Sequence, residues 1–124
     1  MELYRLIKQS SNEIEKNIRA FATITSLNIR SLMKHFPDLR NDFKMKTTQI
    51  MCVQETWCQP CMETNDLNID GFELHLLCQG NGKGIATYFK KDFKITGESN
   101  NKKFQMAIIS NGIYHIINIP YSAS

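Results

Sequence analysis

A short apolar run that ends abruptly in a carboxylate is the feature that most constrains this 124-residue chain. Ile50–Val53 reads Ile-Met-Cys-Val, and Gln54, Glu55 and Thr56 follow it directly. An apolar run without alternation is typical of a strand buried on both faces, as in helix-covered sheets of α/β proteins. In such proteins ligands bind beyond the carboxyl ends of the strands. Glu55 is therefore a candidate metal ligand or base, unless it simply marks where the strand meets water.

A second strand with a polar end lies upstream. Residues Ala22–Leu27 alternate in their first half, which predicts a strand, and Asn28 and Arg30 stand where this strand ends. A second strand over Gln49–Gln54 would be its neighbour, and a helical crossover between them would make the pair parallel. The amide of Asn28 and the carboxylate of Glu55 would then share one edge of the sheet.

The crossover itself shows helical spacing. Leu32, Phe36, Leu39 and Phe43 recur at intervals of four, three and four residues. Because Pro37 suits the first turn of a helix, the pattern predicts a regular helix over Pro37–Lys46 after an irregular turn at Ser31–Phe36.

The two strand ends together resemble a known family. Asn28-Ile-Arg-Ser-Leu32 followed by Gln54-Glu-Thr-Trp57 is similar to the motifs of the endonuclease/exonuclease/phosphatase superfamily, which includes abasic-site nucleases and transposon-encoded endonucleases. The transposon type is the most similar, because it also has the following Trp and a later Gly-Lys-Gly-Ile-Ala strand. The resemblance implies an α/β fold with two sheets packed face to face.

The resemblance also implies a chemistry. Members of the family hydrolyse phosphodiesters or phosphomonoesters with Mg²⁺, which polarises the phosphate. Glu55 matches the carboxylate that binds the metal, and Asn28 matches an Asn that orients the active-site groups and the phosphate. Both are therefore expected catalytic residues, Mg²⁺ is the expected cofactor, and DNA or another phosphodiester is the expected partner.

About half of a family domain is present. The chain has no Gly-Asp-x-Asn and no Ser-Asp-His motif, which would supply the rest of the active site. The expected fold class is therefore α/β, a partial two-sheet α/β sandwich of this type, mostly one sheet with a crossover helix and hairpins. Residues 22–124 would form the truncated domain and residues 1–21 an N-terminal helical leader. We expect little or no activity from the chain alone, and one uncovered apolar sheet face that could pair two copies.

The strands after Trp57 are expected to pair as hairpins. Phe72–Leu77 and Ile85–Phe89 flank a Gly-rich turn, and Phe104–Ile109 and Ile113–Ile119 flank Asn-Gly, a strong turn signal. The lysine-rich stretch Lys90–Asn101 is expected to be a polar connection.

Charge is distributed unevenly although the net charge is only +3. The middle of the chain is acidic, whereas six lysines face two acids from Lys83 onward. A non-catalytic nucleic-acid-binding remnant is thus an alternative function, with a basic stretch over Lys83–Lys103 that contacts phosphates. The residues assigned to this weak nucleic-acid contact are Arg30, Lys83, Lys90, Lys91 and Lys94.

A third possibility comes from Trp57-Cys58-Gln-Pro-Cys61, which is similar to the thioredoxin redox site. A dithiol at a helix start gives an acidified nucleophilic thiolate, but it needs a helix directly after the second cysteine. The residues after Cys61 are rich in Asn and Asp and have weak helical periodicity. A dithiol oxidoreductase using Cys58 and Cys61 is the less favoured alternative.

The location of the protein is expected to be intracellular, nuclear or cytoplasmic. No run approaches the roughly 18 apolar residues of a membrane span, and the N-terminus has no apolar signal core. No membrane partner is expected.

Overall fold

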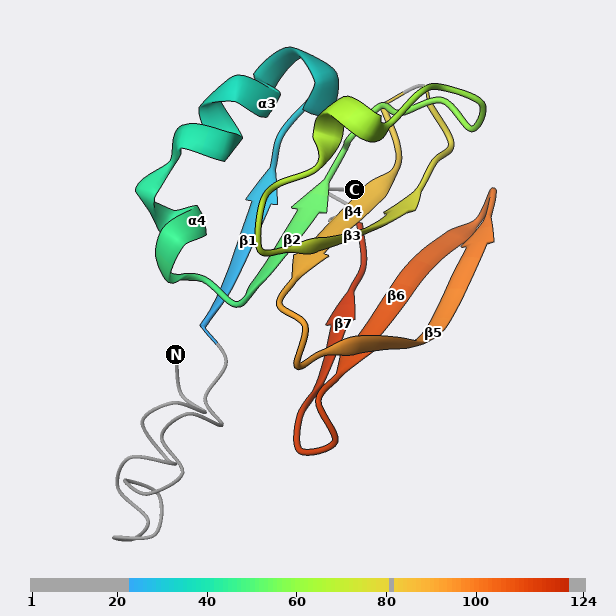
Figure 1. Cartoon of the computed structure of the whole chain (residues 1–124). Coiled ribbons are helices and arrows are strands. Elements are labelled where there is room, and N and C mark those ends of the chain that lie inside the picture. Colours follow the sequence, from blue (N-terminus) through green and yellow to red (C-terminus); the bar gives the residue numbers. More distant parts are fainter. Residues whose placement is uncertain (1–22, 81, 121–124) are drawn as a thin grey trace, which may run out of the picture.

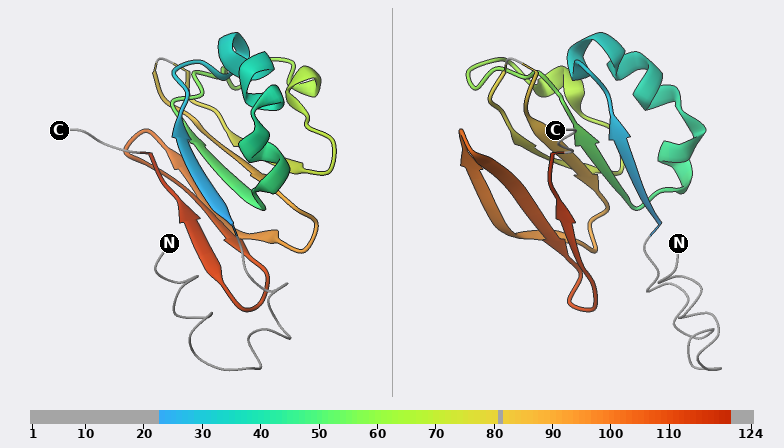
Figure 2. Two further views of the ribbon diagram at one scale, coloured as in Figure 1. Left: turned by 90° about the vertical axis from the view of Figure 1, so that its left-hand side faces the viewer. Right: turned by 180° about the vertical axis from the view of Figure 1, so that it is seen from behind.

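A computed structural model describes residues 23–80 and 82–120, which form two β-sheets and a pair of helices (Figure 1). The helices, the first sheet and the second sheet are stacked in that order (Figure 2). The expectation of an α/β sandwich with two sheets is confirmed. The expected helical leader, residues 1–21, lies outside the described residues.

The first sheet has four strands in the order β1-β2-β4-β3. They are β1 (Ile24–Asn28), β2 (Ile50–Gln54), β3 (Glu73–Leu77) and β4 (Ile85–Phe89). The pair β1 and β2 is parallel, as the crossover predicted, and β4 is antiparallel to both of its neighbours. The predicted hairpin of β3 and β4 is confirmed.

The crossover is more helical than the sequence predicted. Helix α3 spans Leu32–Asn41 and α4 spans Phe43–Thr47, so the predicted irregular turn at Ser31–Phe36 is wrong. Ser31 caps α3, because its side chain accepts a hydrogen bond from the amide of Lys34. Pro37 therefore lies inside the helix and not in its first turn. Burial of Leu32, Phe36 and Leu39 along one face stabilises α3 despite the proline.

The second sheet is antiparallel, in the order β5-β6-β7. Its strands are β5 (Lys94–Asn101), β6 (Phe104–Ser110) and β7 (His115–Asn118). The predicted connection over Lys90–Asn101 is thus wrong for its last eight residues. The side chains of Glu98 and Asn100 on β5 bond to His75 on β3 and to Gln79, two residues after the end of β3. Polar residues therefore occupy inward positions, and β5 lacks the apolar alternation that identifies a strand.

Two hydrophobic cores lie on opposite faces of the first sheet. Met51 and Val53 of β2 pack with the helices, whereas Ile50 and Cys52 pack with the second sheet. Every residue of β2 and of β4 is buried. The unbroken apolar run around Val53 is explained by this double coverage.

The apolar sheet face that was expected to remain uncovered is packed against the second sheet, so that expectation is wrong. Apolar exposure lies instead on the outer face of the second sheet, where Phe104 and Ile117 are about half exposed, at 48% and 56%. Among the described residues, no helix is long and apolar enough to cross a membrane.

Candidate functional site

The ends of β1 and β2 are joined beyond the last paired residues of the two strands. The amide of Ile29 donates to the carbonyl of Gln54 at 3.0 Å, and the amide of Ser31 donates to the carbonyl of Glu55 at 3.0 Å. On the other side, the amide of Trp57 donates to the carbonyl of Lys83 at 2.8 Å. The backbone of Glu55 is therefore held between two neighbouring segments.

This junction concentrates unusual backbone geometry. Arg30, Ser31, Glu55 and Trp57 have φ angles of 47°, 90°, 54° and 59°, and they are the non-glycine residues with positive φ in the described chain. Such conformations cost about 1–3 kcal/mol each and cluster at functional sites. The strained backbone therefore marks this end of the first sheet as a candidate functional site.

Asn28 and Glu55 lie side by side at the junction. The Nδ2 of Asn28 donates a hydrogen bond to Oε2 of Glu55. Asn28 is exposed and Glu55 is half-buried, so both polar ends reach solvent. The contact orients the carboxylate and leaves the carbonyl oxygen of Asn28 available to a ligand.

A cleft of about 600 Å³ opens beside this pair. Its wall contains four cationic residues from three different segments, namely Arg30, Lys83, Lys102 and Lys103. Glu55 is the one carboxylate among the described residues that line it. Among the described residues no ion pair neutralises the four cations, so the cleft favours an anion.

Amide side chains fix the far wall of the cleft. The side-chain amide of Gln105 donates to the carbonyl of Leu77 at 3.1 Å and to Oδ1 of Asn100 at 2.8 Å. Its Oε1 accepts from the amide of Gly84 at 3.1 Å. Gln105 is 3% exposed, so one buried side chain joins β6 to the β3–β4 hairpin.

A second buried amide contact supports the strand that carries Glu55. The Nε2 of Gln54 donates to Oδ1 of Asn118 on β7 at 3.0 Å, and Asn118 donates to Thr87 at 2.9 Å and to the carbonyl of Ala86. The two sheets are thus tied together at Gln54, the residue directly before Glu55.

Known structures share the fold of this chain, although sequence comparison finds no matching family model and no matching curated protein. A 3′ phosphatase, NExo from Neisseria, solved with a product DNA hairpin, superposes with a TM-score of 0.62 and 18% identity over 80% of this chain. An AP endonuclease from Archaeoglobus fulgidus gives 0.61 and 16% over 78%, and AP endonuclease LMAP from Leishmania major gives 0.60 and 15% over 80%.

The chain has the endonuclease/exonuclease/phosphatase fold. It spans 41%, 40% and 40% of the length of these three structures. The fold predicted from the motifs at Asn28 and Glu55 is therefore confirmed over the part of these structures that the chain covers.

The predicted nucleic-acid-binding residues divide between the two ends of this endonuclease/exonuclease/phosphatase fold. Arg30 and Lys83 line the cleft. The amide of Lys90 donates to the carbonyl of Gln49, so Lys90 lies at the start of β2, opposite Glu55. Lys91 follows it, and Lys94 opens β5 at the end remote from the cleft. Lys90, Lys91 and Lys94 therefore lie away from the cleft that Arg30 and Lys83 line.

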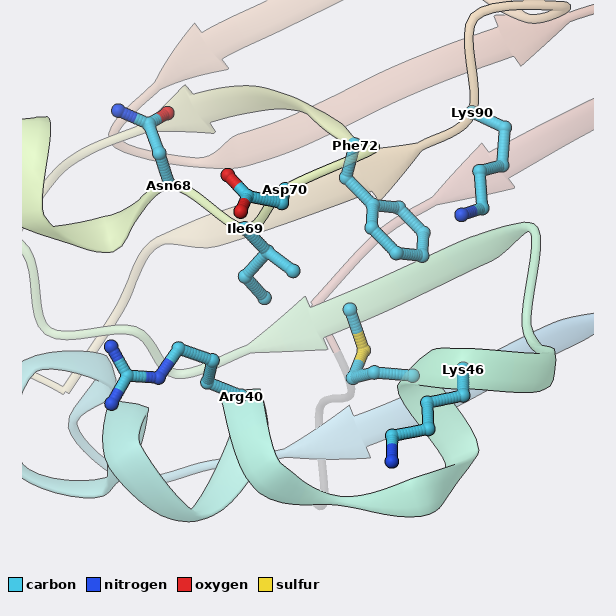
Figure 3. Close-up of a pocket in the computed structure, with 8 residues that line it drawn as sticks. Arg40, Lys46, Asn68, Ile69, Asp70, Phe72 and Lys90 are labelled. Carbon is cyan, nitrogen blue, oxygen red and sulfur yellow. The ribbon is translucent and has the colours of Figure 1, made fainter.

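Lys90 lines a different cavity of about 520 Å³, beside the helices (Figure 3). Its ammonium lies 4.1 Å from the ring centre of Phe72. Arg40 and Lys46, from α3 and α4, line the opposite wall, and their charged ends point away from the Lys90 ammonium (Figure 3). These three cations do not converge on one point.

Lys102 and Lys103 were not among the residues singled out from the sequence, although they end the basic stretch Lys83–Lys103. They lie in the turn between β5 and β6, and only the packing of the second sheet brings this turn to Glu55. Asn118 was missed for the same reason. The sequence signal that could have identified Lys102 and Lys103 was that two lysines are adjacent in a tight turn.

The dithiol alternative fails on its structural requirement. No helix follows Cys61 directly in the described chain, where η2 (Asn65–Leu67) is a single 3₁₀ turn. Cys58 is 1% exposed, and burial raises the pKa of its thiol, against the lowered pKa that a redox nucleophile needs. All four cysteines are free.

The donors in the cleft fit Mg²⁺ in kind but not in number. Mg²⁺ prefers oxygen ligands and is usually held by one or two carboxylates together with water and substrate phosphate. Glu55 supplies one carboxylate, and Asn28 an amide oxygen. Within the described residues, no group of three or more His, Cys, Asp or Glu side chains forms a metal site. The ion would therefore depend on substrate oxygens to complete its coordination.

Proposed function

We propose that this chain is the phosphate-contacting part of a metal-dependent phosphodiesterase of the endonuclease/exonuclease/phosphatase type, and that it binds DNA backbone in the cleft. The observation that carries the proposal is the Asn28–Glu55 pair beside four unneutralised cations. The fold is shared with an NExo structure solved with a DNA hairpin and with AP endonucleases. DNA is therefore the ligand class that we propose first.

The distribution of charge in the cleft supports contacts with the DNA backbone and not with the edges of the bases. Arg30, Lys83, Lys102 and Lys103 come from separate segments, so their charges are spread along the cleft. Lysine contacts to phosphate carry no sequence information, and each one releases counterions when it forms. Binding should therefore weaken steeply with salt and depend little on sequence.

Glu55 is proposed as the metal ligand and Asn28 as the residue that orients it. When bound, Mg²⁺ polarises the phosphate and stabilises the charge that develops on the leaving oxygen. Because Glu55 is the only carboxylate among the described lining residues, we expect retention of the ion only in the presence of phosphate. The chain alone should accordingly bind DNA and hydrolyse it slowly or not at all.

Trp57 provides a direct readout of binding. It is the only tryptophan of the chain and is 43% exposed beside Lys83. We expect its fluorescence to change on titration with a DNA duplex, with an affinity that falls about tenfold or more between 50 and 200 mM salt. Binding that is insensitive to salt would contradict the phosphate-contact proposal.

A pair of charge variants locates the contact. Lys102→Ala/Lys103→Ala should weaken DNA binding about tenfold or more and reduce the salt slope by about two. The matched control is Lys90→Ala/Lys91→Ala, which removes the same charge at the far end of β2 and should have a smaller effect. An equal loss in both variants would assign binding to net charge and not to the cleft.

Substitution of Glu55 distinguishes a catalytic function from non-catalytic binding of nucleic acid. Glu55→Gln should abolish both the Mg²⁺-dependent gain in DNA affinity and any nicking of supercoiled DNA, whereas the exposed control Glu63→Gln should abolish neither. DNA binding that does not respond to Mg²⁺ in the unmodified protein would leave only the non-catalytic nucleic-acid-binding remnant. Nicking that persists in Glu55→Gln would remove Glu55 from the metal role.

A further inference from the structure

The only tryptophan of the chain is exposed although both of its neighbours are buried. Trp57 is 43% exposed, whereas Thr56 and Cys58 on either side of it are each 1% exposed. The tryptophan side chain belongs to neither of the two hydrophobic cores. Because a tryptophan ring is among the largest apolar surfaces that a side chain offers, packing of a core does not account for its presence here.

The backbone fixes the outward position of this ring. Trp57 has a φ of 59°, in the left-handed region that non-glycine residues avoid. Its amide donates to the carbonyl of Lys83 at 2.8 Å, and the amide of Thr56 donates to the carbonyl of Gly84 at 3.1 Å. The strained segment is therefore bonded to the turn between β3 and β4, and Lys83 and Gly84 of that turn line the cleft.

The indole lies at the rim of the cleft. A Cβ built on Gly82 would lie 3.7 Å from Nε1 of Trp57, and Gly82, Lys83 and Glu55 all line the cleft. A large aromatic ring thus stands beside the cations and the proposed metal ligand. Proteins that bind single-stranded nucleic acid combine these two features, because a cationic groove follows the phosphates and the bases stack on aromatic rings.

The face of the indole is not occupied by a cation of the protein. Over residues 23–80 and 82–120, the cations that lie over aromatic rings are Arg40 on Phe36, at 5.8 Å, and Lys90 on Phe72, at 4.1 Å. Both pairs involve rings other than that of Trp57. The indole therefore remains available to a planar ligand such as a nucleobase.

We propose that Trp57 stacks on an unpaired base of a DNA strand whose phosphates lie in the cleft. The inference rests on the proposed function, and it narrows the substrate class to single-stranded or locally unpaired DNA. In a duplex both faces of an internal base are covered by its neighbours, and removing the base from the stack costs free energy. Every base has a face that can stack, so this contact keeps the binding independent of sequence.

Two oligomers of equal length separate stacking from phosphate contact. One is a single-stranded oligothymidylate, and the other keeps its sugars and phosphates but lacks every base. At one salt concentration we expect the oligothymidylate to bind about fivefold or more tightly, measured by the anisotropy of a terminal dye. It should also quench the fluorescence of Trp57, the only tryptophan, more strongly than the base-free oligomer does.

Substitutions of Trp57 test whether its ring carries this preference. Trp57→Leu keeps an apolar side chain but removes the aromatic face, and it should lower the ratio of the two affinities to about one. Trp57→Phe keeps a ring and should retain most of the preference. The control Ile113→Ala removes an apolar side chain that is 63% exposed in the turn between β6 and β7, at the opposite end of the second sheet from the β5–β6 turn, and should keep the full ratio (Figure 1).

The stacking inference and the proposed function fail in different ways. Equal affinity of the unmodified protein for the two oligomers would overturn stacking, while salt-sensitive binding of the base-free oligomer would still support phosphate contact in the cleft. Absence of binding to either oligomer would contradict the proposed function and the stacking with it. A preference that survives in Trp57→Leu would show that another residue contacts the base, and would overturn the role of Trp57.

Discussion

At the scale of single residues, Glu55 occupies a backbone conformation that most side chains avoid. Its φ of 54° lies in the left-handed region, which costs a non-glycine residue about 1–2 kcal/mol. The backbone bonds from Ser31 to Glu55 and from Thr56 to Gly84 hold it there. The carboxylate is therefore aimed at the cleft by its own backbone as well as by Asn28.

Gly84 is required by close contact, and its replacement should be costly. A Cβ at this position would lie 2.4 Å from Oγ1 of Thr56, and the φ of Gly84 is +103°. We expect Gly84→Ala to lower the free energy of unfolding by about 3 kcal/mol, measured by urea denaturation. Gly112→Ala is the control, because its φ is +89° but no atom lies within 4 Å of the added Cβ.

Gly112→Ala should lower the free energy of unfolding by only about 1 kcal/mol, which is the cost of the positive φ angle alone. Equal losses in Gly84→Ala and Gly112→Ala would show that the Thr56 contact has no energetic weight.

Thiol reactivity should separate Cys61 from its neighbours. Cys61 is exposed, whereas Cys52 and Cys58 are buried with raised pKa values. At neutral pH we expect one fast-reacting thiol toward a disulfide reagent, and Cys61→Ser should remove it. If Cys58→Ser removed it instead, the dithiol chemistry predicted from Cys58 and Cys61 would regain support.

The sequence alone predicted that Asn28 and Glu55 lie close together. Both residues stand at the ends of short strands joined by one crossover, and parallel neighbouring strands end at the same edge of a sheet. It was insufficient for Lys102, Lys103 and Asn118. Their proximity to Glu55 depends on how the second sheet packs on the first, and no local pattern encodes that packing.

At the scale of elements, α3 illustrates tertiary packing overriding local preference. Pro37 cannot donate to the carbonyl of Met33 and crowds it, which would end an isolated helix. Leu32, Phe36 and Leu39 are nevertheless all buried against the first sheet. The helix boundary predicted from Pro37 was wrong because the rule describes an isolated helix and not a packed one.

Replacing that proline should stabilise the protein. Pro37 is exposed, so Pro37→Ala restores a helical amide without altering the core, and we expect a gain of about 1–2 kcal/mol in the free energy of unfolding. The control Pro60→Ala changes an exposed loop proline and should give no gain. A loss of stability in Pro37→Ala would mean that the proline fixes the bend toward α4.

The strand β5 shows a different limit of sequence reasoning. The strands β1, β6 and β7 were identified by apolar residues, but Glu98 and Asn100 of β5 bond to His75 on β3 and to Gln79 just after β3. A strand stabilised by polar contacts between layers has the composition of a loop. Only the partner positions His75 and Gln79, on a distant segment, explain it.

At the scale of the whole molecule, burial of several ionisable groups predicts alkaline instability. Burial raises the pKa of Cys52 and of Cys78 from 9.0 to about 11, and it also raises the pKa of the Tyr88 hydroxyl. These groups are neutral in the folded protein and ionise at lower pH in the unfolded chain. The free energy of unfolding is therefore fully retained below pH 9 and falls as the pH rises toward 11.

For Cys52 alone the loss should amount to about 2–3 kcal/mol, followed as the free energy of unfolding in urea between pH 8 and 11. Cys52→Ala should flatten this decline. An unchanged decline in the variant would assign the alkaline transition to other groups.

The strand β2 belongs to both cores at once, with alternate side chains facing the helices and the second sheet. Its amides can therefore exchange with solvent only when both layers separate, which requires global unfolding. Glu55 follows the last residue of that strand directly. Warming or mild denaturant will thus loosen the outer edges long before it disturbs the position of this carboxylate, and the cleft should keep its shape until the protein itself melts.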